Sequence, residues 1–519
     1  MKLELDLRLT PEEAASETCR RRHLAQALEI TPERITESRI MRRTIDARRW
    51  PATINLRLQV SYDEPGSTKS TKPSVYPEVT GRPEVHIIGA GPAGLFAGLR
   101  LIELGRRPII LERGKEVKAR KQDIAAIYRE QRINPDSNYG FGEGGAGTYS
   151  DGKLFTRSRK RGDVRKILEV LHQHGAPAEI LIDAHPHVGS NRLPAVITAL
   201  RKTILAAGGE IHFETRVEDF RLHGNRITHL QTPNDLIPVA EVILATGHSA
   251  REIFRMMAAH KLRLEAKAFA MGVRIEHPQT LIDRLQYHGH ERGPFLPAAA
   301  YSLATQVQGR GVYSFCMCPG GFIVPAATSD REIVVNGMSS RARDSKYANA
   351  GMVVELQLCD LPQPLHPLAG LDFQEQLERL CQKQGGGRQT APGQRLTDFI
   401  EGRRSSSLPE TSYHPGLADS RLEQWLPEMI SFRLRQGLIA FNRRMPGFIT
   451  DEAVLVGVES RTSSPVRIPR DPVRLQHPEI ENLYPCGEGA GYAGGIISAA
   501  IDGERCAQGI CPPADLFPG

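Results

Sequence analysis

The sequence predicts an α/β protein in which a small α+β unit precedes a larger body with a parallel sheet. Strand-like and helix-like patterns alternate over residues 84–155 and 190–250, and they return over 450–510. The stretch from 268 to 340 is richer in strand-like runs. A glycine-rich turn between a buried strand and an apolar helix opens the first alternating region, which is typical of a nucleotide-binding sheet.

Length and composition agree with a multidomain globular protein. The chain has 519 residues, of which 40% are hydrophobic and 24% are charged. The formal charge of +7 is a mild excess on this length and makes nucleic acid a weakly supported partner. The N-terminus lacks the apolar core of a signal peptide, and no run is long enough to span a membrane. We therefore expect a cytoplasmic protein with no membrane partner.

The first element is a small α+β unit at residues 1–62. "KLELDLRL" and "ATINLRLQVSY" alternate as strands do, and a helix is expected between them. Thr10 is a typical N-cap for that helix, and Pro11 suits its first position. Residues 63–83 are rich in Pro, Gly, Ser, Thr and Lys without periodicity, so they are predicted to be a linker.

The next element is a dinucleotide fingerprint. In "EVHIIGAGPAGLFAGLRLIELGRRPIILERG", Gly89 permits the tight turn, Gly91 lets a pyrophosphate approach the backbone, and Gly94 allows the helix to pack on the strand. The second strand ends at Glu112, which is expected to accept hydrogen bonds from ribose hydroxyls. Arg113 follows and is expected to lie over the adenine.

The fingerprint does not distinguish FAD from NAD, but three distant segments favour FAD. "EVILATGHSAR" (241–251) is a strand that would return beneath the cofactor at Thr246 and Gly247. "NYGFGEGGAGTYSDGKL" (138–154) is a glycine-rich loop that is expected to wrap a large ligand.

The third segment is "NLYPCGEGAGYAGGIISAAIDG" (482–503), a strand, a glycine-rich turn and a helix. Its turn would meet the ribityl chain or the pyrophosphate. Its helix would point a positive end at the N1/C2=O edge of the flavin, where a reduced flavin carries negative charge. The predicted cofactor-binding set outside the residues already named is Pro92, Ala93, Gly145, Val217, Gly487, Glu488, Gly494, Gly495 and Ile496.

These stretches, together with "FCMCPGG", resemble a family of bacterial FAD-dependent dehydrogenases (FAD-utilising oxidoreductases) within the broader glutathione-reductase-type flavoproteins. The resemblance implies bound FAD in a Rossmann-like, three-layer ββα/α domain made of residues 84–267 and 450–519. It also implies an inserted α+β substrate domain at 268–449, and it assigns no substrate. Glu488 departs from the wider pattern, in which Asp is usual.

The resulting hypothesis is an FAD-dependent oxidoreductase that transfers a hydride or an electron pair between flavin and an unidentified small organic substrate. No second fingerprint follows a strand, so NADH or NADPH would be a transient donor at most. Two alternatives stay open at this stage. One is a flavin-dependent RNA-modifying enzyme, and the other is a non-catalytic flavin-binding protein.

"VYSFCMCPGG" (312–321) places two thiols one residue apart before a turn. They could be small buried residues, a redox or charge-transfer thiol against the flavin, or metal ligands; further ligands are lacking, so no metal site is predicted. A thiolate needs a nearby cation. A structural or solvated role is the alternative for each candidate cation. The predicted catalytic set, expected on the substrate side of the flavin, is Cys316, Cys318, Lys153 and Arg461.

Overall fold

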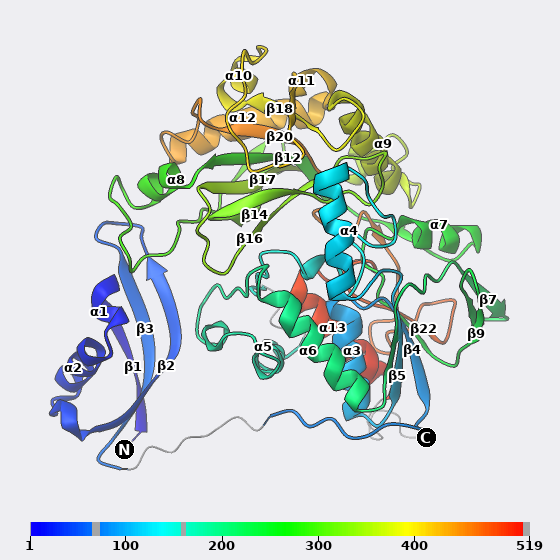
Figure 1. The fold of residues 1–519 in the computed structure, drawn as a ribbon, viewed down its shortest axis with the longest axis horizontal. Coiled ribbons are helices and arrows are strands. Elements are labelled where there is room, and N and C mark those ends of the chain that lie inside the picture. The colour runs from blue at the N-terminus through cyan, green and yellow to red at the C-terminus, as the bar shows by residue number, and fades with distance from the viewer. Residues whose placement is uncertain (1, 65–72, 157–161, 512–519) are drawn as a thin grey trace.

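The computed structural model describes residues 2–64, 73–156 and 162–511. Figure 1 shows three regions: an N-terminal unit on the left, a lower body around a parallel sheet, and an upper body around a second sheet. Among the described residues, no helix combines the length and apolar character that crossing a bilayer requires.

The N-terminal unit is a three-stranded antiparallel sheet in the order β1-β3-β2 with two short helices. The predicted N-cap is confirmed, because the Thr10 hydroxyl accepts from the Glu13 N–H while the Glu13 carboxylate accepts from the Thr10 N–H. Arg43 joins the unit to the body through an ion pair of 2.7 Å with Asp183. Its elements are β1 (Lys2–Leu9), α1 (Pro11–Ala15), α2 (Glu17–Leu28), a 3-10 turn (Pro32–Arg34), β2 (Ile35–Asp46) and β3 (Thr53–Tyr62).

The lower body confirms the predicted three-layer α/β architecture. Its five parallel strands have the order β22-β10-β4-β5-β6, so strands that are far apart in sequence lie next to each other. Alternate strand residues face opposite layers: Ile87 and Ile243 pack with helices, whereas Ile88 and Leu244 pack toward a small antiparallel sheet. The five strands are β4 (Glu84–Ile88), β5 (Arg107–Leu111), β6 (Glu210–His212), β10 (Val242–Leu244) and β22 (Leu483–Pro485).

Helices cover one face of this sheet, and α3 lies beside α13 and α6 (Figure 1). The other face carries the antiparallel sheet β7-β8-β9. The helices of the lower body are α3 (Pro92–Glu103), α4 (Val117–Glu130), α5 (Val164–Gln173), α6 (Leu193–Ala206), α7 (Arg251–Ala259) and α13 (Ile496–Ile510). Of these, α7 packs on the β7-β8-β9 side of the sheet. The remaining elements are β7 (Asp219–His223), β8 (Arg226–Gln231), β9 (Leu236–Pro238), β11 (Glu265–Ala266), β21 (Val466–Arg467) and the 3-10 turns Gly145–Gly147 and Ala178–Leu181.

The upper body is built on a seven-stranded sheet in the order β13-β14-β17-β12-β20-β18-β19. The sequence predicted that the chain returns to the FAD-binding domain at residue 450, and this boundary is wrong for one strand. Strand β20 pairs with β12 and β18 of the upper sheet instead of joining the lower body. Its run "VLVGVE" is apolar enough for either sheet, and a strand's pattern does not reveal its neighbours. The strands are β12 (Phe269–Pro278), β13 (Ala304–Val307), β14 (Arg310–Cys318), β17 (Tyr347–Leu356), β18 (Ala391–Arg395), β19 (Leu417–Asp419) and β20 (Val454–Glu459).

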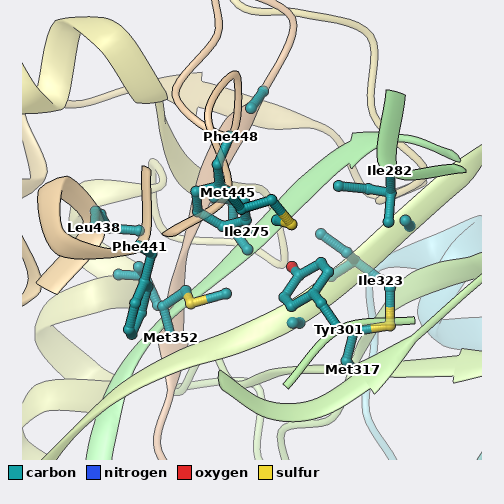
Figure 2. Packing of buried hydrophobic residues seen from close by; sticks show 14 of the residues in the cluster. Ile275, Ile282, Tyr301, Met317, Ile323, Met352, Leu438, Phe441, Met445 and Phe448 are labelled. Atoms are coloured by element: carbon teal, nitrogen blue, oxygen red, sulfur yellow. The ribbon is translucent and has the colours of Figure 1, made fainter. Parts of the chain in front are cut away.

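The core of the upper body lies between this sheet and α12. Figure 2 shows Leu438 and Phe441 of α12 close to Met352 of β17, with Met317 of β14 pointing into the same apolar cluster. Around it lie α8 (Gln279–Gln286), the hairpin β15 (Gly321–Pro325) and β16 (Val335–Ser339), a 3-10 turn (Leu358–Asp360), α9 (Ala369–Gln384), α10 (Leu396–Glu401), α11 (Leu422–Trp425) and α12 (Glu428–Arg444).

The contact between α13 and α3 leads to a stability prediction. A Cβ added at Gly503 would lie 2.0 Å from the Ala93 carbonyl oxygen. Helix propensity alone favours Ala over Gly by about 1 kcal/mol, whereas overpacking costs about 1–3 kcal/mol, so the steric effect should win. We expect Gly503→Ala to lower the free energy of unfolding by about 1–2 kcal/mol in urea titrations.

The matched control is Gln508→Ala on the exposed side of the same helix. It should change the unfolding free energy by no more than about 0.5 kcal/mol. A Gly503→Ala protein as stable as this control would contradict the close packing of the two helices.

Candidate functional site

A cavity of about 440 Å³ lies where the two bodies meet. Its wall combines the turn after β4, the carboxyl ends of β5 and β10, the 139–153 loop, parts of β14 and β16, the end of β20 and the start of α13. This is the position where open parallel sheets bind ligands, beyond the carboxyl ends of their strands.

The fingerprint turn is open toward the cavity. Gly89 has φ +104, and a Cβ there would lie 2.6 Å from the Ala245 carbonyl oxygen, so this position requires glycine. A Cβ on Gly91 would have the Gly145 Cα, 4.0 Å away, as its nearest described neighbour. Gly94 packs α3 against the turn, since a Cβ there would lie 1.9 Å from the Gly89 oxygen. The turn therefore leaves room for a bound diphosphate beside Gly91.

Glu112 is fixed at the cavity wall by three backbone groups. The N–H groups of Ala90, Gly114 and Gly142 donate to its carboxylate at 2.8, 2.9 and 3.0 Å. The residue is only 4% exposed, yet it lines the cavity. A carboxylate held in this way can accept further hydrogen bonds from ligand hydroxyls, as the sequence predicts.

Arg113 lines the cavity beside it, and its guanidinium has protein partners. It pairs with Asp136 at 2.7 Å and Glu252 at 2.5 Å, and it stacks over the Phe141 ring at 4.0 Å. These contacts fix the Arg113 side chain at the cavity wall. Its position over an adenine remains a prediction.

The C-terminal segment meets the same cavity. Gly495 has φ +127, and nothing described lies within 4 Å of a Cβ added at Gly494 or Gly495. The N-terminus of α13 therefore opens into the cavity, as does that of α3. The Gly495 N–H donates to the Glu488 carboxylate, so Glu488 supports the turn. The other predicted cofactor residues at the wall are Pro92, Ala93, Gly145, Val217, Thr246, Gly247, Gly487 and Ile496.

The donor set fits FAD. Backbone N–H groups at two helix starts suit a diphosphate, and fixed carboxylates suit ribose and ribityl hydroxyls. The glycines leave these groups uncovered by side chains.

A cluster of charged and thiol groups forms one part of the cavity wall. The Lys153 ammonium lies 3.6 Å from the Cys316 sulfur, 3.4 Å from the Cys318 sulfur and 3.2 Å from the Asp151 carboxylate. Lys153 and Cys316 line the cavity, whereas Cys318 is fully buried behind it. The structure therefore brings together three of the four predicted catalytic residues.

A β-bulge places Cys316 at the wall. Phe315 pairs with Gly351 and Cys318 pairs with Asn349, so two residues of β14 oppose one residue of β17. Within the bulge Cys316 takes φ +46, and Met317 is buried in the apolar cluster of Figure 2. Because of the bulge, the Cys316 side chain lies at the cavity wall and the neighbouring Met317 side chain lies in the core.

The two thiols differ in acidity. A hydrogen bond from Cys318, together with Lys153 and Arg274, holds the pKa of Cys316 well below its ordinary value despite burial. The same thiol–thiol hydrogen bond and burial raise the pKa of Cys318. Burial opposes the charge on Lys153, but the two cysteines and Asp151 raise its pKa overall. The arrangement therefore favours a Cys316 thiolate, a Cys318 thiol and a Lys153 ammonium.

Sequence reasoning missed a second ion pair at this wall. Arg274 of β12 pairs with Glu459 of β20 at 2.6 Å, donates to the Cys316 carbonyl at 2.9 Å, and lies 3.8 Å from the Cys318 sulfur. Burial raises the pKa of Glu459 to about 7, although Arg274 opposes the shift. The available signal was a charged residue inside the apolar runs "FAMGVRIEHP" and "VLVGVE".

Arg461 also lies at the wall, but its donors are occupied. Its guanidinium bonds Glu378 and Glu332 at 3.0 Å each and the Thr328 hydroxyl at 3.1 Å. This network favours the structural interpretation that the sequence left open. The catalytic assignment of Arg461 remains a prediction.

Three families match parts of the chain. A family described as FAD-dependent protein, C-terminal domain-like, matches residues 268–462, and one described as FAD dependent oxidoreductase matches 149–313. A domain of unknown function matches residues 1–61. An uncharacterised protein of Clostridium beijerinckii is 39% identical over 515 residues, covering 95% of this chain and 96% of its own.

Solved structures are similar at a lower level. L-proline dehydrogenase from P. horikoshii has 13% identity and a TM-score of 0.34, covering 84% of this chain and 94% of its own. Glycine oxidase from Bacillus cereus has 12% identity and a TM-score of 0.30, covering 82% and 94%.

Glu459 leads to a pH prediction. Its pKa rises from the ordinary 4.5 to about 7 on folding, so between these values the native chain holds a proton that the unfolded chain has released. The resulting stability is present below pH 4.5 and is lost as the pH rises to 7. We expect this loss, about 3 kcal/mol, to be absent in Glu459→Gln.

Urea unfolding of the two proteins at several pH values measures the difference. Curves of unfolding free energy against pH that run parallel would show that Glu459 titrates at its ordinary value in the folded chain.

Proposed function

Because the chain belongs to a family of FAD-dependent oxidoreductases, we propose that its cavity is the place where bound FAD exchanges a hydride or an electron pair with a small organic substrate. The observation that carries this proposal is the continuity of the cavity. One volume joins the open glycine turn at Gly91 to the wall that contains Lys153 and Cys316.

Residues on one side of the cavity are assigned to cofactor binding. The N–H groups that begin α3 and α13 would bind the anionic parts of FAD, because helix N-termini carry partial positive charge. Glu112 would accept hydrogen bonds from ribose hydroxyls. Glu488 would hold the α13 turn and meet the ribityl chain.

Residues on the other side are assigned to the substrate. FAD supplies the two-electron chemistry when it is bound. The Lys153 ammonium would orient an electron-rich group of the substrate, and Glu459, with a pKa of about 7, can hold or release a proton near neutral pH. Arg274 keeps Glu459 in place through their buried ion pair.

The cofactor assignment predicts the effect of a side chain at Gly91. The structure has room for an added Cβ there, because the nearest described atom to it is 4.0 Å away, and Gly91 lines the cavity into which a longer side chain would extend. That side chain would fill the space assigned to the diphosphate. We expect Gly91→Val to keep the melting temperature of the apoprotein and to weaken FAD binding at least about tenfold, or about 1.4 kcal/mol.

Flavin absorbance after gel filtration and a titration of the apoprotein with FAD measure the effect. A Gly91→Ala protein should give an intermediate affinity. Full retention of FAD by the Val variant would place the diphosphate elsewhere.

The substrate assignment predicts how a nicotinamide donor would behave. If NADH or NADPH visits this cavity, anaerobic mixing should bleach the flavin, and Lys153→Met should slow the bleaching by on the order of 100-fold. Lys346→Met is the matched control, because Lys346 is exposed and pairs with Glu410. Stopped-flow absorbance measures both rates. An unchanged flavin spectrum with both nucleotides would exclude a direct nicotinamide donor.

A further inference from the structure

The proposed transfer between FAD and a substrate assigns no role to the two neighbouring thiols, Cys316 and Cys318. We propose that Cys316 and Cys318 form a redox-active dithiol that cycles to a disulfide and connects FAD to a small disulfide substrate. The inference rests on the proposed function, because it takes FAD in this cavity as the partner of the pair.

The first support is geometry. Both sulfurs lie within 3.6 Å of the same Lys153 nitrogen. The Cys318 sulfur also lies 3.3 Å from the Cys316 carbonyl oxygen. The bulge in β14 is the reason that residues two apart in a strand converge on one ammonium.

The second support is the division of roles between the thiols. Cys316 faces the cavity and is favoured as the thiolate, which is the nucleophilic form in thiol–disulfide exchange. Cys318 is fully buried and remains protonated, so an entering molecule cannot reach it directly. This is the arrangement of an attacking thiol with a resolving thiol behind it.

The third support is the charge around the pair. Lys153 is anchored by Asp151, and Asp151 also binds Arg343 at 3.1 Å. Arg274 is anchored by Glu459 and reaches the Cys318 sulfur. Cations fixed in this way stabilise the thiolate, which makes the disulfide easier to reduce. A disulfide between residues two apart is also strained, and this strain likewise makes the disulfide easier to reduce.

The bonds and electrons of the cycle balance. The Cys316 thiolate attacks the substrate disulfide, forms a mixed disulfide and releases one substrate thiolate. Cys318 then attacks the Cys316 sulfur, so the protein disulfide forms and the second substrate thiol leaves. Bound FAD in its reduced anionic form would supply an electron pair and one proton, which break the protein disulfide and restore one thiolate and one thiol. The oxidised FAD would then be reduced again by a hydride from a nicotinamide donor, NADH or NADPH.

A second pair of neighbouring cysteines lies away from the cavity and differs from the Cys316–Cys318 pair. Cys486 and Cys506 are buried beside Asp502, and the three ligand atoms lie within 4.8 Å of one another. Arg470 already bonds both Asp502, at 2.6 Å, and the Cys506 sulfur, at 3.3 Å. Neither cysteine is among the described residues that line the cavity, so we expect no exchange with an added disulfide there.

The first experiment uses 5,5′-dithiobis(2-nitrobenzoate) as the disulfide probe on the reduced full chain. In the wild type, Cys316 should react and Cys318 should resolve the adduct, leaving a 316–318 disulfide without bound nitrobenzoate. In Cys318→Ser, the adduct should persist on Cys316. Cys359→Ser is the control for the exposed thiol near Arg310. Peptide mass spectrometry locates each product.

The second experiment tests the link to FAD by anaerobic dithionite titration of the oxidised holoprotein. The wild type should take up one electron pair before the flavin bleaches and twice as many electrons per flavin as Cys316→Ser, which should bleach from the first addition.

An unreacted Cys316, a persistent wild-type adduct, or immediate bleaching with equal electron uptake in both proteins would overturn the inference. These results would appear in a protein that contains reducible FAD. A purified chain without FAD, or with flavin that no donor reduces, would instead overturn the proposed function.

Discussion

The Lys153 ammonium is the contact on which the arrangement of the site depends. It is partly buried where the two bodies meet, and a buried charge costs several kcal/mol unless opposite charges surround it. Asp151 supplies one such charge from the lower body, and the thiols of β14 supply the other from the upper body. The same cation therefore stabilises the interface between the bodies and the ionised form of Cys316. A stable interface and a reactive sulfur are two results of one electrostatic requirement.

A second constraint acts through space that the chain leaves empty. At Gly89, steric contact with the Ala245 carbonyl permits only glycine, whereas an added Cβ at Gly91 or Gly494 would have no described atom nearer than 4.0 Å. The first kind of glycine lets strands β4 and β10 end side by side. The second kind leaves helix starts uncovered for a ligand. The proposed cofactor site therefore offers a ligand backbone N–H groups at two helix starts beside the Glu112 carboxylate.

Much of this site was predictable from the sequence because its segments are local. The strand, turn and helix around Gly89 and the Gly487–Ile496 turn each carry their pattern within about one helix length, and the predicted cofactor-binding residues other than Gly94 line one cavity. Pairing between distant strands was not predictable, so β20 was placed in the wrong body. The Arg274–Glu459 pair and the carboxylate partners of Arg461 depend on that same pairing. The bulge that places Cys316 at the cavity wall is a change of register between β14 and β17. The sequence of one strand does not show how it is paired with its neighbour.

The interleaved order of the strands has a consequence for biosynthesis. The central strand β4 begins at Glu84, but its sheet and its ligand cavity also need β22 and the start of α13, beyond Leu483. A nascent chain still on the ribosome can form the N-terminal unit and much of the upper body before those residues emerge. The cavity proposed for FAD cannot form until then, so loading of FAD there must follow translation of the residues up to the start of α13. Until that moment the apolar faces of the unfinished sheet need protection from aggregation.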